Sequence, residues 1–188
     1  WRWATKVGSF EVRLELLTDV YDSPGQSIAL PGTDVASAQN IDGPRAVRTD
    51  TIRRQLPVDP GDRRGGHHEV TLQFVGLGGY LLAKAAAILG RSASKDTYDL
   101  AFVLLHNIDG GPGPAGRAAA RVADGDQERL FLSALRRFEG VDSEGAQQFA
   151  TQRTADGVDA DPDALAQDAV AAAAECRQAF LDERAERR

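Results

Sequence analysis

The chain has 188 residues, of which 42% are hydrophobic and 27% charged, and its formal net charge is −6. These values describe a globular protein with enough apolar side chains for a core, and they exclude collagen, a disordered tail and a disulfide scaffold. The single cysteine, Cys176, excludes an intramolecular disulfide. The apolar stretch 77–89 is too short to cross a bilayer, so we expect no membrane partner and a cytoplasmic location.

The sequence contains no methionine. Because translation starts with methionine, we expect the chain to be the C-terminal part of a longer protein.

Charge is distributed unevenly along the chain, since nine acidic residues and only four arginines follow Arg153. Six arginines lie between positions 45 and 64. This segment fits either a contact with an RNA backbone or a solvated surface loop, and the sequence leaves both open.

The N-terminal part of the chain predicts strands. Apolar residues alternate with charged ones from Phe10 to Leu17, which is typical of a half-buried strand. The segments 27–30 and 69–75 predict two more strands. Between them, Thr33 and Asp34 predict the cap of a short helix that ends at Asn40, and 41–66 is expected to be mainly loop.

The C-terminal part predicts helices, over 80–89, 95–107, 114–123, 126–138 and 143–152 and from position 162 onward. The last helix has the clearest start, with Asp161 as N-cap and Pro162 at the first helical position. Strands followed by helices predict an α+β fold. We expect residues 1–76 to hold part of a mixed sheet of about three strands, and residues 77–188 to form a helical bundle.

Lys84 is the only charged residue between positions 77 and 90. A lysine on an apolar helix must reach solvent or find an anion, because burying an unpaired ammonium is costly. Arg91 follows seven residues later on the same side of the helix, and two such cations suit a bound polyphosphate. The alternatives are that Lys84 reaches solvent, or that it forms a structural salt bridge with Asp96 or Asp99.

Asp96 and Asp99 are three residues apart in the first turns of their helix and therefore share a face. One of these carboxylates could act as a general base or orient a substrate. Acidic residues in a first helical turn also stabilise the helix dipole without any chemistry. From spacing alone, the structural interpretation is favoured.

The run from Gly78 to Leu100 resembles the C-terminal signature of the AbiEii/AbiGii-type nucleotidyltransferase toxins, a family similar to the MenT toxins. In that signature a helical lysine is followed by an arginine and then by Lys/Arg-Asp-x-x-Asp-Leu. The chain matches it with Lys84, Arg91 and the segment Lys95–Leu100. The resemblance implies a polymerase-β-like fold that transfers a nucleotide from a nucleoside triphosphate, with Mg²⁺, to an RNA or protein. In MenT-type toxins the acceptor is the tRNA 3′ end.

Carried over by motif, Lys84 would hold the triphosphate, with Arg91 and Lys95 as supporting cations. Asp96 would assist the acceptor or orient Lys84, and Asp99 is the second catalytic carboxylate candidate. A cognate antitoxin is the implied protein partner. The alternative function is a non-catalytic helical binding module, or a degenerate homologue, that docks an antitoxin or another protein.

Enzymes of this type also need an Asp-x-Asp pair that binds metal ions. No Asp-x-Asp precedes Glu15 in this sequence, so we expect the chain not to catalyse transfer alone. Glu15, on the polar face of the first predicted strand, is the candidate metal ligand. The alternative is that Glu15 faces solvent and pairs with an arginine across the strands.

Overall fold

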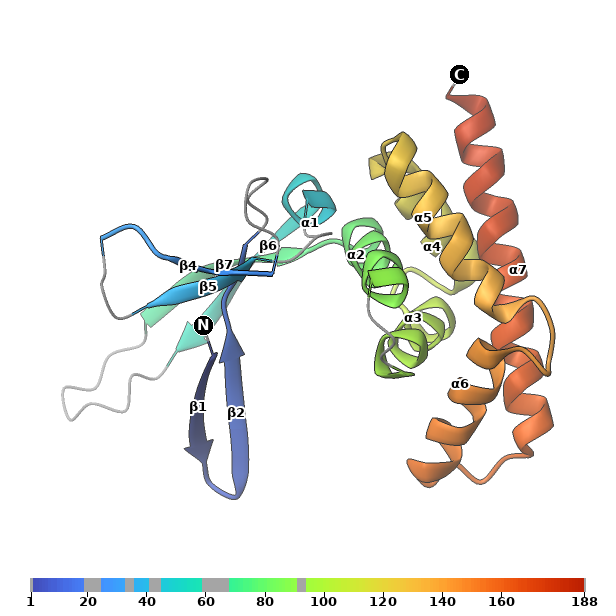
Figure 1. Ribbon diagram of the computed structural model, residues 1–188, viewed down its shortest axis with the longest axis horizontal. Coiled ribbons are helices and arrows are strands. Elements are labelled where there is room, and N and C mark those ends of the chain that lie inside the picture. Colours follow the sequence, from blue (N-terminus) through green and yellow to red (C-terminus); the bar gives the residue numbers. More distant parts are fainter. Residues whose placement is uncertain are drawn as a thin grey trace. The chain divides into compact units, whose positions relative to one another are not determined.

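The computed structural model describes residues 2–18, 25–32, 36–40, 45–58, 68–90 and 94–187. The fold is α+β as predicted, with small sheets in the first part of the chain and a helical bundle in the second (Figure 1). Internal contacts divide the chain into two compact units, Trp1–Arg45 and Ala46–Arg188. This division falls earlier than the predicted one after residue 76, because the last two strands group with the helices.

The first unit contains two small sheets, formed by β1 (Arg2–Val7), β2 (Phe10–Glu15), β3 (Leu17–Thr18), β4 (Ser27–Ala29) and β5 (Ser37–Asn40). β1 and β2 form an antiparallel hairpin. β5 lies between β3, its parallel partner, and β4, its antiparallel partner, which makes the second sheet mixed.

Two predictions in this part of the chain are wrong. The segment that ends at Asn40 is strand β5 and not a helix, since its pairing with β3 and β4 overrides a short local signal. The predicted caps, Thr33 and Asp34, lie outside the described residues. The expected loop 41–66 contains α1 (Arg45–Thr49) and β6 (Thr51–Val58). Pro57 is compatible with β6 because one edge of a two-stranded hairpin needs no N–H donor.

β6 pairs with β7 (His68–Val75) to form an antiparallel hairpin in the second unit. The predicted strand at 69–75 is therefore confirmed, as is the one that starts at Phe10. The half-burial predicted for the strand that starts at Phe10 is wrong, because its apolar face is open, and the apolar face of β7 is open as well. Phe10 is 75% exposed on β2, and Phe74 is 42% exposed on β7.

The predicted helices are confirmed. They are α2 (Leu77–Gly90), α3 (Ser94–His106), α4 (Pro112–Val122), α5 (Gly125–Leu135), α6 (Glu144–Ala155) and α7 (Pro162–Glu186), with a 3₁₀ turn at Arg136–Phe138. Asp161 caps α7 as predicted, since its side chain accepts from the Asp163 N–H. Within the described part of the chain, no helix has both the length and the apolar character to cross a membrane.

The long helix α7 packs on α4 and α6, and α2 contacts α3, α4 and α5 (Figure 1). The largest buried side chains of this bundle are phenylalanines. The ring centroids of Phe131 and Phe180 lie 5.1 Å apart. Helices α4 and α7 approach closely at Gly116, where a Cβ atom would collide with the Cys176 carbonyl group. The core is therefore built from a few large rings and many small residues.

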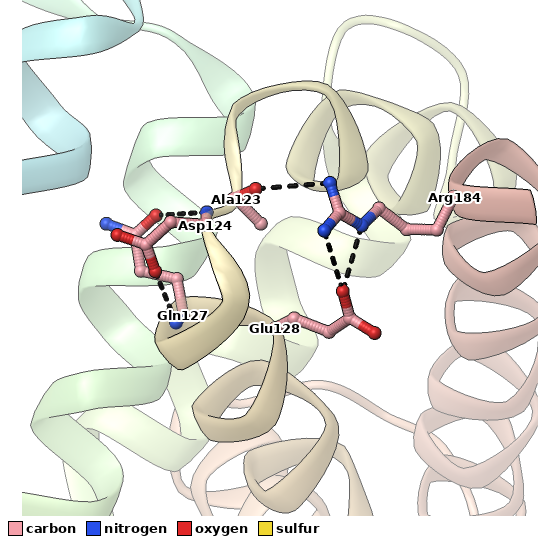
Figure 2. A network of polar contacts seen from close by, with 5 residues as sticks. All are labelled: Ala123, Asp124, Gln127, Glu128 and Arg184. Atoms are coloured by element: carbon pink, nitrogen blue, oxygen red, sulfur yellow. Dashed lines mark hydrogen bonds and ion pairs between the residues drawn. The ribbon is translucent and has the colours of Figure 1, made fainter. Parts of the chain in front are cut away.

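A polar network ties the end of α7 to the turn between α4 and α5 (Figure 2). Arg184 donates to Glu128 at 2.9 Å and to the Ala123 carbonyl at 3.3 Å. Asp124 and Gln127 form a capping box that fixes the start of α5. These contacts satisfy backbone groups at helix ends, which would otherwise lack partners.

Candidate functional site

The candidate site is built around Lys84 on α2. The helix is apolar in composition, and its buried face includes Leu81, Ala85 and Ile88. Lys84 projects from the same helix toward α3, and its side chain is 20% exposed. The ammonium is thus neither fully buried nor free in solvent.

Two carboxylates of α3 hold the Lys84 ammonium. Its Nζ lies 3.0 Å from Oδ1 of Asp96 and 2.6 Å from Oδ2 of Asp99. Asp96 is almost completely buried, with 3% of its side chain exposed. The salt bridge considered from the sequence is therefore present, and it involves both aspartates. Their spacing of three residues places both on the face of α3 that meets α2.

Tyr80 is a further member of this cluster. It lies one turn before Lys84 on α2, and its ring centroid is 5.7 Å from Nζ. Burial raises the pKa of Tyr80, the Lys84 charge opposes this shift, and the Asp99 charge adds to it. Tyr80 was not predicted as a site residue from the sequence. Its i, i+4 spacing to Lys84 does indicate that the two side chains lie on the same side of the helix.

The electrostatics keep Lys84 charged. Partial burial by itself lowers the pKa of Lys84, but the hydrogen bonds to Asp99 and Asp96 outweigh burial, so the pKa is raised above the ordinary value of 10.5. Lys84 therefore keeps its proton at neutral pH and is not a general base. One ammonium and two carboxylates give the cluster a net charge of −1.

The other predicted site residues are Lys95, Arg91 and Glu15. Lys95 is exposed at the start of α3, and Arg91 lies outside the described residues. Glu15 belongs to the first unit, where its carboxylate is 2.6 Å from Nε of Arg2, its partner across the β1–β2 hairpin. The cross-strand pair considered for Glu15 is thus the observed arrangement.

The acidic side chains are the candidate ligands for the Mg²⁺ that the resemblance implies. Across the described ranges, no group of three or more His, Cys, Asp or Glu side chains could hold a metal ion. Asp96 and Asp99 are engaged with Lys84, and Glu15 with Arg2. As arranged here, these carboxylates are paired with basic side chains and do not form a ready set of Mg²⁺ ligands.

Helix α3 also borders a polar hollow of about 310 Å³ on its contact with α6. Ser94 and Tyr98 line it from α3, and glutamines 147, 148 and 152 line it from α6. The Tyr98 hydroxyl donates to Asp156 at 2.9 Å. Lys84 and its two aspartates are not among the residues that line this hollow.

No protein-family model, curated protein or solved structure matches this chain. The resemblance to nucleotidyltransferase toxins therefore rests on the motif residues between Gly78 and Leu100 alone. Of these, Lys84, Asp96 and Asp99 are in direct contact in the structure.

Proposed function

We propose that this chain forms the triphosphate-binding side of a nucleotidyltransferase of the toxin type. The observation that carries the proposal is the contact of Lys84 with Asp96 and Asp99. A helix that is otherwise apolar presents one permanently charged, partly exposed ammonium, held in a fixed geometry by two neighbouring carboxylates. A charged lysine held in a fixed geometry suits a contact with a nucleotide phosphate, provided that Mg²⁺ or other cations from outside the cluster offset its net charge of −1.

The roles within the cluster follow from its geometry. Lys84 would contact the triphosphate, because its charge is accessible and is kept by hydrogen bonding. Asp96 is buried and would orient Lys84, since a buried carboxylate is poorly placed to meet a large acceptor. Asp99 is 20% exposed and is the better candidate for a contact with the acceptor group.

The remaining parts of the proposal come from the motif resemblance. The acceptor would be an RNA, with the tRNA 3′ end as the first candidate, or a protein, and the reaction would take place in the cytoplasm with a cognate antitoxin as partner. Mg²⁺ would accompany the nucleoside triphosphate. Because the described residues form no metal site, the ion would need ligands from outside the cluster.

Nucleotide binding is the most direct test. The chain is titrated with each of the four nucleoside triphosphates, with and without Mg²⁺, while the ammonium signal of Lys84 is followed by ¹⁵N NMR. At least one nucleotide should shift this signal, and Lys84→Met should lose the binding. Lys6→Met, which removes a lysine of the first unit, is the matched control. If no nucleotide binds, or if Lys84→Met binds as well as the control, the proposed role of Lys84 is wrong.

A second candidate function, a protein-docking module, is favoured by the open apolar faces of the hairpins. Phe10 and Leu14 are 75% and 59% exposed on β2, and Leu72 and Phe74 are 43% and 42% exposed on β7. Such clustered apolar side chains are characteristic of interaction surfaces. Binding of a protein partner that is lost in Phe10→Ser or Phe74→Ser but kept in Lys84→Met would support this function.

A further inference from the structure

Helix α2, which carries Lys84, begins without a capping side chain of its own. The Gly76 carbonyl accepts the first helical hydrogen bond, from the Tyr80 N–H at 3.0 Å, so Gly76 occupies the N-cap position. Glycine has no side chain for the capping role that Ser, Thr, Asp or Asn fills there. The first turn also contains Gly78 and Gly79 but no acidic residue. Because glycine is a poor helix former, this turn is weak by itself.

Asp50 supplies the missing cap from a distant part of the sequence. It directly precedes β6, and its backbone carbonyl accepts from the Gly76 N–H at 2.7 Å. Its side-chain Oδ2 accepts from the Gly79 N–H, also at 2.7 Å. Gly79 is the third residue of the helix, the position to which an N-cap side chain normally bonds. Asp50 thus takes the place of an N-cap carboxylate from 29 residues away.

The capping carboxylate fits only because residue 76 is glycine. A Cβ atom on Gly76 would lie 2.5 Å from Cγ of Asp50 and 2.6 Å from its Oδ2, far inside van der Waals contact. A local cap and the remote cap therefore exclude each other. Asp50 and Gly76 form a matched pair at the point where the β6–β7 hairpin meets α2.

We infer that Asp50 is a positioning residue for Lys84, and that it occupies the place where the start of α2 would otherwise attract a phosphate. Gly79 is followed directly by Tyr80, whose ring lies 5.7 Å from the Lys84 ammonium. Lys84 itself is five residues beyond Gly79, about 7.5 Å along the helix. Fixing Gly79 therefore fixes the turn that leads to the cation.

The charge of Asp50 has a second consequence. A helix N-terminus attracts anions through its free N–H groups and its dipole. Here a carboxylate of the chain itself already fills that role, so the start of α2 is not available to the phosphates that Lys84 would hold. This part of the inference rests on the proposed function, in which Lys84 holds the triphosphate.

The test compares Asp50→Ala and Asp50→Asn with the unmodified chain. The chain has three lysines, Lys6, Lys84 and Lys95, so the Lys84 ammonium signal can be assigned by ¹⁵N NMR. Asp50→Ala should lower the thermal midpoint by about 2–4 °C. It should also move the Lys84 signal toward that of a free lysine and weaken nucleotide binding about fivefold. Asp50→Asn keeps an acceptor oxygen, so it should retain part of the stability, part of the Lys84 signal shift and part of the nucleotide affinity.

Two further variants make the test specific. Asp124→Ala removes the local cap of α5 (Figure 2), so it should lower the midpoint similarly but leave the Lys84 signal unchanged. Gly76→Ala displaces the Asp50 carboxylate and should reproduce Asp50→Ala, and the double variant should be no worse than either single one.

The outcomes are separable from those of the proposed function. If the unmodified chain binds no nucleotide, the proposed function fails, while the Lys84 signal still decides the positioning role. If Asp50→Ala lowers the thermal midpoint but leaves the Lys84 NMR signal as in the unmodified chain, Asp50 only stabilises the helix as a cap. That result would overturn the inference. Additive effects of Asp50→Ala and Gly76→Ala would contradict the shared geometry.

Discussion

Lys84 and Asp99 face each other across α2 and α3, with the lysine Nζ 2.6 Å from Oδ2 of the aspartate. Asp96, three residues before Asp99, accepts a second hydrogen bond from the same ammonium. The three groups join two helices and still leave the Lys84 side chain 20% exposed. One cluster can therefore stabilise the bundle and offer a positive charge to a ligand.

Removing the cation should destabilise the protein. In Lys84→Met, the buried Asp96 loses a charged partner and stays close to the Asp99 carboxylate. We expect the free energy of unfolding to fall by about 2–4 kcal/mol, measured by urea denaturation at pH 7. Lys6→Met should change it by less than about 0.5 kcal/mol. A Lys84→Met chain as stable as Lys6→Met would show that the cluster contributes nothing.

The repulsion left in Lys84→Met should be relieved by removing one charge. The double variant Lys84→Met/Asp99→Asn should recover part of the lost stability, because a single carboxylate then remains. The same urea titrations measure this recovery. If the double variant has a lower free energy of unfolding than Lys84→Met, repulsion between the two aspartates does not cause the instability of Lys84→Met.

Stability should decline at alkaline pH. The pKa of Lys84 is raised in the folded chain, so the folded state binds its proton more tightly than the unfolded state. The resulting stabilisation is complete below the ordinary value of 10.5 and is lost as pH rises through the folded value. The raised pKa of Tyr80 acts in the same direction from about its ordinary value of 10.0 upward. Unfolding titrations between pH 8 and 12 should show the decline, and it should be shallower in Lys84→Met.

Gly116 should tolerate no side chain. A Cβ atom there would lie 3.0 Å from the Phe180 nitrogen and would overlap the Cys176 carbonyl group. We expect Gly116→Ala to lower the free energy of unfolding by about 1–3 kcal/mol, since α4 and α7 must move apart. Gly125→Ala, at the open start of α5, has nothing within 4 Å of the new atom and should be neutral or slightly stabilising. Equal thermal midpoints for the two variants would contradict the close packing.

Cys176 should be unreactive in the folded protein. It is fully buried, and burial raises the pKa of its thiol to about 12. Because the thiolate is the reactive species, a thiol reagent at pH 8 should label Cys176 only as fast as the bundle opens. Labelling rates with and without urea measure this. Rapid labelling of the native protein would show that α7 opens readily from the bundle.

The helices could be predicted because their signals are local. The cap at Asp161 and the proline that follows it are both present in the structure. The spacing of Asp96 and Asp99 likewise placed both on one face, and a salt bridge from Lys84 to one of them was among the alternatives that the sequence left open.

The remaining features depend on tertiary structure. β5 is a strand because β3 and β4 pair with it, which no pattern in four residues can show. Asp50 caps α2 from a position that only the hairpin register brings close to Gly79. The exposure of apolar faces such as that of Phe10 could not be predicted either. Alternation of apolar and polar residues identifies the apolar face of a strand, but it does not say whether another element covers that face.

The most direct measurement of the central claim is nucleotide transfer by the full-length protein. The protein is incubated with each α-labelled nucleoside triphosphate, Mg²⁺ and total tRNA, and labelled RNA is quantified. We expect labelling that falls about 10²-fold or more in Lys84→Met and substantially in Lys84→Arg, which keeps the charge but not the geometry. Lys6→Met should label as the natural protein does. Undiminished labelling by folded Lys84→Met, or no labelling of RNA or protein by the natural protein, would contradict the account.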